Sequence, residues 1–390
     1  MTDPRCILIT DDYLPHLGGS RLYCHKAANL LAGALAVVTR EREGGAEFDA
    51  AARYPLRRVR LQGERKYGVA LAGEALNGAR LARCALSGFP GMRTFLAGEV
   101  NPAAFAAAFA AWHRRGAYGV IIHDEPLTGA SALEARLRRR VIRRAGALVV
   151  SSRFAEGRAR EIAPGETPIF YAPPGVDTAE FSPGAADAAV LSRCGAGSKP
   201  FILSVGRLVD YKNVSAGIDA IAALRERGLH LVVAGEGPER TVLEAQAKRL
   251  GVDQLVTFAG RVQRDELIQL YRGALAYVFP TRKSLGCRHE GIGMAALEAA
   301  ASGCPVIAST VTSATDFLED GRTGLFFDPE DKDALVRAVR LLLDSPDTRA
   351  RMASECADAV RERFTWENTA AVVQEAIQHL QAAIRHKFLP

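Results

Sequence analysis

Short apolar runs alternate with helical patterns along all 390 residues. Runs rich in Val, Ile and Leu predict buried strands, and in the first half these are Cys6–Thr10, Val120–Ile122 and Ala147–Val150. In the second half they are Phe201–Val205, His230–Ala234, Leu255–Phe258, Ala276–Phe279 and Pro305–Ala308. Strand–helix alternation with right-handed crossovers predicts an α/β chain made of doubly wound, Rossmann-like parallel sheets.

Length and proline positions predict two domains. A chain of this size holds about two domains of roughly 100–200 residues. Pro164, Pro168, Pro173, Pro174, Pro183 and Pro200 indicate a linker, because proline cannot donate to a central strand ladder. We therefore expect domains at residues 1–178 and 179–369, followed by a helix over about 370–390. Residues 66–105 lack a clear period, and we expect helix and loop there.

Positive charge gathers in the first half. The net charge is +6, but residues 51–150 carry 17 Lys and Arg against 6 Asp and Glu. Two clusters stand out, Arg57, Arg58, Arg60, Arg65 and Lys66, and Arg136, Arg138, Arg139, Arg140, Arg143 and Arg144. They favour an anionic partner, such as acidic lipid headgroups or a phosphorylated substrate, or else form a solvated helix face. Nucleic acid is disfavoured, because no aromatic residues interleave with the basic runs.

Other sequence features narrow the class of protein to which the chain can belong. No apolar run reaches the roughly 18 residues that span a bilayer, and the N-terminus has no basic-then-apolar signal pattern. Seven scattered cysteines without C-x-x-C spacing predict reduced thiols in the cytoplasm, with no structural zinc. The Asp331-Lys332-Asp333 triplet opens a helical pattern, and we interpret it as capping charge, with no metal expected.

The strongest chemical motif is residues 290–298, Glu-Gly-Ile-Gly-Met-Ala-Ala-Leu-Glu. It follows a strand and leads into a helix, so Gly291 and Gly293 let a ligand approach the amides of the first helical turn. Glu290 can accept hydrogen bonds from hydroxyls ahead of that helix, and Glu298 can do so within it. A nucleotide sugar would match this arrangement, because it carries hydroxyls at both ends and phosphates between them. The alternative is a glutamate near a helix start and another on the surface.

Further loops follow other strands. Arg207 and Lys212 lie between a strand and a helix, where they either clamp phosphate oxygens or are ordinary surface cations. Gly235 belongs to a tight turn that favours a nucleotide pocket over an NAD site, since the third fingerprint glycine is absent. Gly18 and Gly19 follow the first strand, either approaching a ligand or forming a simple turn. His123 follows another strand, where it either bonds a substrate hydroxyl or is a plain loop histidine.

Together these residues resemble the retaining glycosyltransferases of family GT4, which have the GT-B fold of two facing doubly wound domains with an interdomain cleft. The resemblance covers nearly the whole chain. It rests on Glu290 and Glu298, Gly206-Arg207 with Lys212, Ala234 to Pro238, Pro174 to Asp177 with Phe181 to Pro183, and Glu319 to Gly321 with Gly324-Leu325. It implies an acceptor-binding first domain, a second domain that binds the nucleotide sugar, and a final helix that packs back on the first domain.

The resemblance also implies roles for individual residues. Arg207 and Lys212 would clamp the donor diphosphate, and Glu298 would hold the ribose. Glu290 and the amides of Gly291, Ile292, Gly293 and Met294 would hold the sugar and the distal phosphate. The backbone near Val262 would meet the base, Gly18 and Gly19 the diphosphate, and His123 the sugar and acceptor.

The implied activity is retaining and metal-independent transfer of a hexosyl group from GDP-mannose or a UDP-sugar to a lipid or glycan hydroxyl. Two departures leave the sugar open. Thr312 to Asp316 replace a Gly-Gly…Glu stretch of many relatives, and the insert Arg282 to His289 resembles that of phosphatidylinositol mannoside mannosyltransferases. An epimerase, a phosphorylase and a non-catalytic sugar-nucleotide sensor stay as alternatives. We expect a cytoplasmic protein, with peripheral contact to an anionic membrane through the basic first domain as a further hypothesis.

Overall fold

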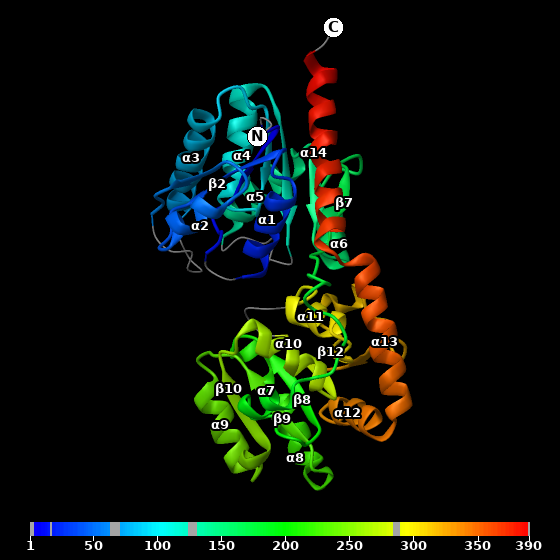
Figure 1. Ribbon diagram of the computed structural model, residues 1–390. Helices are drawn as coiled ribbons and strands as arrows, with labels where there is room; N and C mark the ends of the chain where they lie inside the picture. The colour runs from blue at the N-terminus through cyan, green and yellow to red at the C-terminus, as the bar shows by residue number, and fades with distance from the viewer. Residues whose placement is uncertain (1–3, 16–17, 63–70, 124–130, 284–288, 389–390) are drawn as a thin grey trace. The chain divides into compact units, whose positions relative to one another are not determined.

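The computed structural model describes residues 4–15, 18–62, 71–123, 131–283 and 289–388 (Figure 1). The chain folds into two compact units. Unit 1 comprises Met1–Gly175 together with Trp366–Pro390, and unit 2 comprises Val176–Thr365. Each unit holds one parallel sheet with flanking helices, which confirms the predicted doubly wound α/β fold.

Unit 1 contains a seven-stranded sheet in the order β3-β2-β1-β4-β5-β6-β7, and every neighbouring pair is parallel. Its strands are β1 (Cys6–Ile9), β2 (Leu35–Arg40), β3 (Leu56–Val59), β4 (Thr94–Ala97), β5 (Ala117–Ile122), β6 (Ala147–Val150) and β7 (Ile169–Tyr171). The strands β1, β2, β4 and β6 are buried along their whole length, which explains their continuous apolar sequences.

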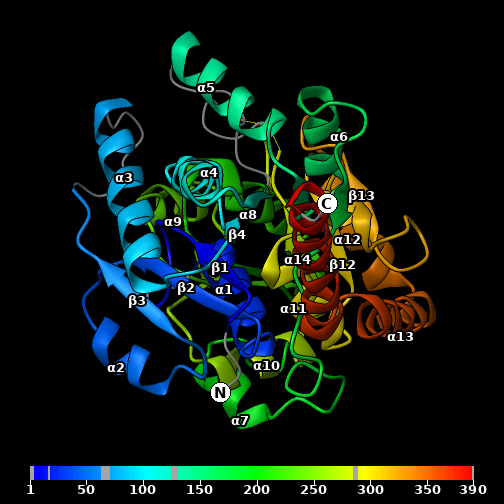
Figure 2. The same ribbon diagram turned by 90° about the horizontal axis from the view of Figure 1, so that it is seen from above.

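Helices cover both faces of this sheet. They are α1 (Gly19–Leu30), α2 (Gly45–Ala51), α3 (Leu71–Gly88), α4 (Ala103–Arg114), α5 (Ala132–Arg143), α6 (Arg153–Ile162) and α14 (Trp366–Phe388). Apolar residues of α3, α4, α5 and α6 pack with Ile7 and Ile9 in one core cluster. Figure 2 shows α1 and α14 beside each other, and α14 packs against β5 and β6. The Thr369 hydroxyl donates to the carbonyl of Pro173 at 2.6 Å, which ties α14 to the end of unit 1's first segment.

Unit 2 contains a six-stranded parallel sheet in the order β10-β9-β8-β11-β12-β13. Its strands are β8 (Phe201–Val205), β9 (His230–Ala234), β10 (Val256–Gly260), β11 (Ala276–Phe279), β12 (Val306–Ser309) and β13 (Leu325–Phe327). Its α-helices are α7 (Ala188–Arg193), α8 (Val214–Ala223), α9 (Arg240–Arg249), α10 (Arg264–Gly273), α11 (Met294–Ala301), α12 (Ala334–Asp344) and α13 (Pro346–Arg363). Two core clusters, one on each face of the sheet, bury the apolar sides of these helices.

Three expectations need correction. Residues 66–105 hold a strand, β4, besides helix α3, and that strand lies next to β1 within the sheet. The proline-rich segment is not only a linker, because β7 forms the sheet edge between Pro168 and Pro173, where strand prolines are tolerated. The helix expected from Asp331 begins at Ala334, after a turn in which the Asp331 carboxylate accepts a hydrogen bond from the Asp333 amide at 3.0 Å.

Among the described helices, none combines the length and apolar character needed to cross a bilayer.

Candidate functional site

The predicted donor residues of unit 2 gather where its strand order reverses. From β8 the chain proceeds outward to β9 and β10, and it then returns to add β11, β12 and β13 on the other side. In doubly wound sheets, ligands bind at the carboxyl ends of the strands on either side of such a reversal, which here are β8 and β11. Lys212 belongs to the loop after β8 and Glu290 to the loop after β11.

Lys212 and Glu290 form an ion pair across this point, although 78 residues separate them in sequence. The second carboxylate oxygen of Glu290 accepts the hydroxyl of Thr281. The Lys212 Nζ atom also lies 5.5 Å from the centre of the Phe279 ring. Both charged side chains are partly buried, so a ligand bound at this point would meet one cation and one anion, the anion also bonded to a hydroxyl.

Hydrogen bonds accepted by backbone carbonyls fix the two loops to each other. Lys212 ends a short 3₁₀ helix, η1 (Asp210–Lys212), and Asn213 follows in the left-handed region at φ 53°. The Asn213 side chain donates to the Pro280 carbonyl at 3.0 Å, and the Arg282 amide donates to the Tyr211 carbonyl at 2.9 Å. This interlocking holds Lys212 opposite the loop of Glu290.

The segment after β12 holds the backbone of Glu290. The Glu290 amide donates to the Val311 carbonyl at 2.9 Å, and its carbonyl accepts the Ser313 amide at 2.8 Å. The His289 Nε2 atom lies 2.9 Å from the Ser313 hydroxyl. Burial lowers the pKa of His289 to about 4, so its imidazole stays neutral at neutral pH. Val311 and Ser313 thus position the backbone of Glu290.

Helix α11 begins at Met294, shortly after Glu290, as predicted. Gly293 precedes its first residue with φ 78°, and a Cβ atom there would approach the Phe279 ring to 2.7 Å. Only glycine fits that position, because left-handed backbone and close packing coincide there. Ile292 is 2 % exposed and packs in the core, so only its backbone is available for a ligand. The first-turn amides of α11, beginning at Met294, lie next to Glu290 and Gly291 in sequence, and such amides favour an anion.

Glu298 lies within α11 and is not the surface glutamate of the alternative interpretation. The Tyr271 hydroxyl donates to its carboxylate at 3.3 Å. Burial is the main cause that raises the pKa of Glu298 to about 7, against the opposing effect of the nearby Arg264 guanidinium. Arg264 is ion-paired with Glu180, whose charge adds to the raised pKa. A half-buried acid with a raised pKa is typical of a binding site.

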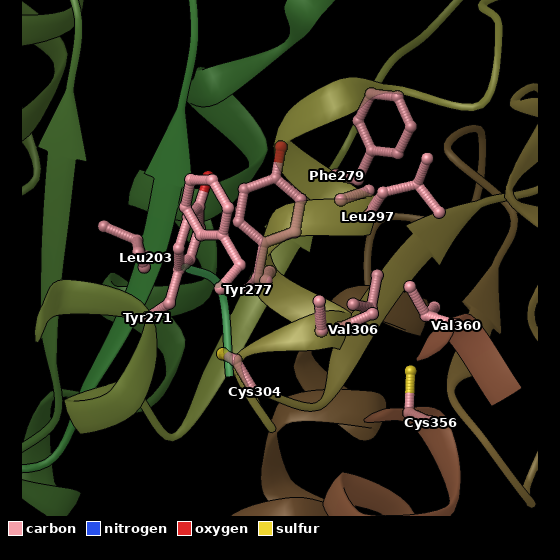
Figure 3. Close-up of a cluster of buried hydrophobic side chains, with 14 of the residues drawn as sticks. Leu203, Tyr271, Tyr277, Phe279, Leu297, Cys304, Val306, Cys356 and Val360 are labelled. Atoms are coloured by element: carbon pink, nitrogen blue, oxygen red, sulfur yellow. The ribbon is translucent and has the colours of Figure 1, made fainter. Parts of the chain in front are cut away.

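Buried aromatic residues pack near the Glu298 carboxylate. Tyr271 and Tyr277 are buried with ring centres 6.1 Å apart at 78°. In Figure 3 they lie next to Leu203, with Phe279 and Leu297 on the neighbouring side of the cluster. The strand β11 carries both Tyr277 and Phe279, so the core of unit 2 continues directly into the loop that holds Thr281 and Glu290.

The loops after β8 and β9 pack backbone against backbone. Gly235 has φ 151°, and a Cβ atom there would lie 1.8 Å from the Gly206 carbonyl oxygen. Close packing therefore accounts for Gly235, and its role toward a nucleotide stays a prediction. Arg207 follows Gly206 and is exposed, with its guanidinium donating to the Tyr211 hydroxyl at 3.2 Å. Val262 is half-buried at the edge of the core, after β10.

Unit 1 holds the remaining predicted residues. Gly18 precedes α1 in an extended conformation, and both it and Gly19 are exposed. His123 directly follows β5, and its ring centre lies 5.2 Å from that of Tyr23 at 82°. His16, Asp124, Glu125 and residues 284–288 lie outside the described residues, as do Arg65 and Lys66. As predicted, the two glycines lie between β1 and the body of α1, and His123 lies at the carboxyl end of β5.

The structure adds residues that sequence analysis missed. Thr281 could have been found, since it follows β11 by two residues at the edge where ligands bind. Tyr271, Arg264 and Ser313 carry no local signal, because they come from other elements. Within the ranges that the structure describes, no group of three or more His, Cys, Asp or Glu side chains converges as a metal site would require.

Comparison with known proteins gives consistent matches. Residues 195–357 match the family model described as Glycosyl transferases group 1. The chain is 31% identical over 394 residues to a GDP-mannose-dependent alpha-(1-6)-phosphatidylinositol monomannoside mannosyltransferase of Mycobacterium tuberculosis, covering 97% of this chain and 99% of the relative. The enzyme of the same description from Mycolicibacterium smegmatis is 29% identical, covering 95% and 97%.

A solved structure agrees in fold. HepE of Anabaena in complex with UDP superimposes with a TM-score of 0.77 at 18% identity, covering 97% of this chain and 100% of that chain.

Proposed function

Because this chain belongs to the group 1 glycosyltransferases and is therefore a hexosyltransferase, we propose that it transfers a mannosyl group from GDP-mannose to a hydroxyl of a phosphatidylinositol-type lipid. The donor and acceptor come from the nearly full-length match to enzymes of that description. The observation that carries the active site is the Lys212–Glu290 pair at the reversal of strand order in unit 2.

The ion pair suggests how the donor is held. The diphosphate brings negative charge to Lys212 and Arg207, and it competes with Glu290 for the Lys212 ammonium. Glu290 then accepts hydrogen bonds from sugar hydroxyls, while Thr281 keeps one carboxylate oxygen oriented. Glu298 accepts from the ribose, and the backbone at Gly235 and Val262 adjoins the nucleoside.

The amides of residues 291–294 supply the remaining contacts. They bind the distal phosphate at the start of α11, which leaves the side chain of Ile292 in the core. A phosphate held there develops its leaving charge next to partial positive charge that is already oriented.

We propose retention of configuration by front-face transfer. The bond between the anomeric carbon and the phosphate oxygen breaks as the acceptor oxygen bonds to the same face of that carbon. The acceptor proton passes to the departing phosphate oxygen, and GDP leaves. Arg207 and Lys212 stabilise the charge that grows on the diphosphate, the task for which other enzymes use a divalent cation. The reaction then proceeds without added metal.

Unit 1 is proposed to bind the acceptor. His123 would accept or donate a hydrogen bond to the acceptor or sugar hydroxyl, held by its edge-on contact with Tyr23. Gly18 and Gly19 would adjoin the diphosphate, because exposed glycines ahead of α1 let a ligand approach the backbone. A lipid acceptor requires that the protein reach a membrane surface, so we propose peripheral contact with anionic lipid.

A direct assay tests this function. Purified protein is mixed with GDP-mannose or UDP-glucose and vesicles containing phosphatidylinositol in the presence of EDTA, and nucleotide release and mannosylated lipid are measured. Lys212→Ala and Glu290→Ala should each lower the rate at least tenfold. Lys248→Ala and Glu330→Ala, exposed residues of the same unit, are the matched controls and should leave it unchanged.

The double variant adds a sharper criterion. Since Lys212 and Glu290 contact each other directly, the losses of the two single variants should not add in the double variant. Unchanged turnover in both single variants would refute the site. An epimer formed from donor alone, or a requirement for inorganic phosphate, would replace the transferase assignment by an epimerase or a phosphorylase.

A further inference from the structure

An apolar groove runs along helix α3 in unit 1. It encloses about 810 Å³ and is lined by Phe105 and Phe109 of α4, by Leu137 of α5, and by residues of α3 that are small or apolar apart from Glu74 and Arg83. Figure 2 shows α3, α4 and α5 following one another on one side of unit 1. A groove of this size lies within the range of sites that hold the apolar part of a ligand.

Large apolar side chains stand exposed beside the groove. Trp112 is 75% exposed and Phe109 is 50% exposed, and their ring centres lie 5.8 Å apart on α4. Leu133 of α5 is 57% exposed, one turn before the groove residue Leu137. Exposed aromatic residues clustered in this way are more typical of an interaction surface than of the rest of a protein's exterior.

The same helix α5 presents a row of arginines. Arg136, Arg140 and Arg143 recur at helical spacing on one side of α5, are exposed, and line a second hollow of about 690 Å³. Arg138, by contrast, is ion-paired with Glu134. Helix α5 thus carries basic and apolar side chains on adjoining flanks.

Two arginines of the other basic cluster, Arg57 and Arg58, are engaged within unit 1. Arg58 is ion-paired with Asp49 at 2.9 Å and donates to the Leu14 carbonyl at 2.8 Å. The Arg57 guanidinium lies 5.6 Å from the centre of the Phe89 ring. From the sequence alone, an anionic partner was expected to contact these arginines. Because they already make contacts within unit 1, helix α5 is the better candidate for a lipid contact.

We propose that Phe109, Trp112, Leu133, Arg136, Arg140 and Arg143, together the α4–α5 face, dock on an anionic phospholipid bilayer. The arginines meet lipid phosphates, and the aromatic residues enter the interface, where tryptophan is favoured. Free phosphate would use the arginines but leave the groove and the aromatic residues unexplained. This inference rests on the proposed lipid acceptor, since a membrane-docked enzyme meets that acceptor at its surface.

Tryptophan fluorescence tests the face directly. The chain has two tryptophans, and Trp366 is 4% exposed, so a change in emission on lipid binding reports mainly Trp112. Vesicles of phosphatidylcholine mixed with phosphatidylinositol should shift the emission of the full-length protein to the blue, and lipids brominated in their chains should quench it. Pure phosphatidylcholine vesicles should have a much smaller effect. Trp112→Phe should abolish the shift.

Vesicle flotation tests the arginines. The variant Arg136→Gln/Arg140→Gln/Arg143→Gln should bind anionic vesicles about a hundredfold more weakly, because each arginine near the surface contributes about fivefold. The matched control replaces three exposed basic residues of unit 2, Arg225, Lys248 and Arg249, by glutamine. It changes the net charge equally and should bind as the wild type does.

The outcomes separate this inference from the proposed function. GDP release from GDP-mannose without vesicles should be the same in both triple variants and in the wild type, which shows that the donor site is intact. A Trp112 shift without mannosylated lipid would support the face and refute the acceptor. Mannosylated lipid with no Trp112 shift would overturn the face alone. Equal vesicle binding by both triple variants, or capture of an acidic protein in place of anionic vesicles, would also overturn it.

Discussion

Replacing Glu298 by glutamine should stabilise unit 2 while weakening donor binding. In the folded protein, burial raises the pKa of this carboxyl from 4.5 to about 7. Between those pH values the unfolded chain releases the proton and the folded chain keeps it, so the free energy of unfolding falls as pH rises. The full difference is at most about 3 kcal/mol above pH 7, since one pKa unit corresponds to 1.36 kcal/mol. Glutamine removes that penalty but keeps the hydrogen bond from Tyr271.

Urea denaturation of wild type and Glu298→Gln across the pH range measures this effect. The two proteins should unfold at similar urea concentrations near pH 4.5 and separate progressively up to about pH 7.5, with the variant more stable. GDP-mannose affinity, measured by calorimetry at pH 7.5, should fall about tenfold, because a neutral amide accepts hydrogen bonds from ribose hydroxyls less strongly than a carboxylate. Glu330→Gln, at an exposed position, is the control and should change neither quantity. A pH-independent difference in stability would refute the burial of Glu298.

Two further predictions concern the loops of unit 2. Gly235→Ala should destabilise the protein by about 2 kcal/mol or more in thermal unfolding, because its Cβ atom would meet the Gly206 carbonyl oxygen at 1.8 Å. Gly157→Ala, at an exposed position of helix α6 with nothing near its Cβ position, should instead stabilise by about 0.5–1 kcal/mol, and loss of stability in both variants would contradict this distinction. His289 has its pKa lowered to about 4 by burial, so wild-type stability should fall as pH drops from 6.5 toward 4 by up to about 3 kcal/mol. His289→Gln should flatten that part of the denaturation profile, and an unaltered slope would show that His289 is solvated.

The loops of the site could be predicted because their signals are local. Apolar runs marked β8 and β11, and the glycines and glutamates that follow β11 marked a ligand loop at the start of α11. The strand β4 (Thr94–Ala97) escaped detection because it holds only two large apolar residues, Phe95 and Leu96, in a stretch interrupted by glycines. The edge strand β7 was obscured by flanking prolines, which an edge tolerates and a central strand does not.

The sequence by itself therefore determined the fold class, the strand-end loops and the chemical character of the residues in them. Only the tertiary structure decided which of those residues meet. Lys212 pairs with Glu290 because the strand order reverses between β8 and β11, a property of sheet topology that no local pattern carries. Glu298 acquires its raised pKa mainly from burial within the fold, with a smaller contribution from the charge of Glu180, which is distant in sequence. Helical spacing in α5 was visible in the sequence, but only the fold packed α5 next to α4 and left Arg136, Arg140 and Arg143 exposed, while Arg58 pairs with Asp49. Side-chain partners are set by packing in three dimensions, which no local pattern carries.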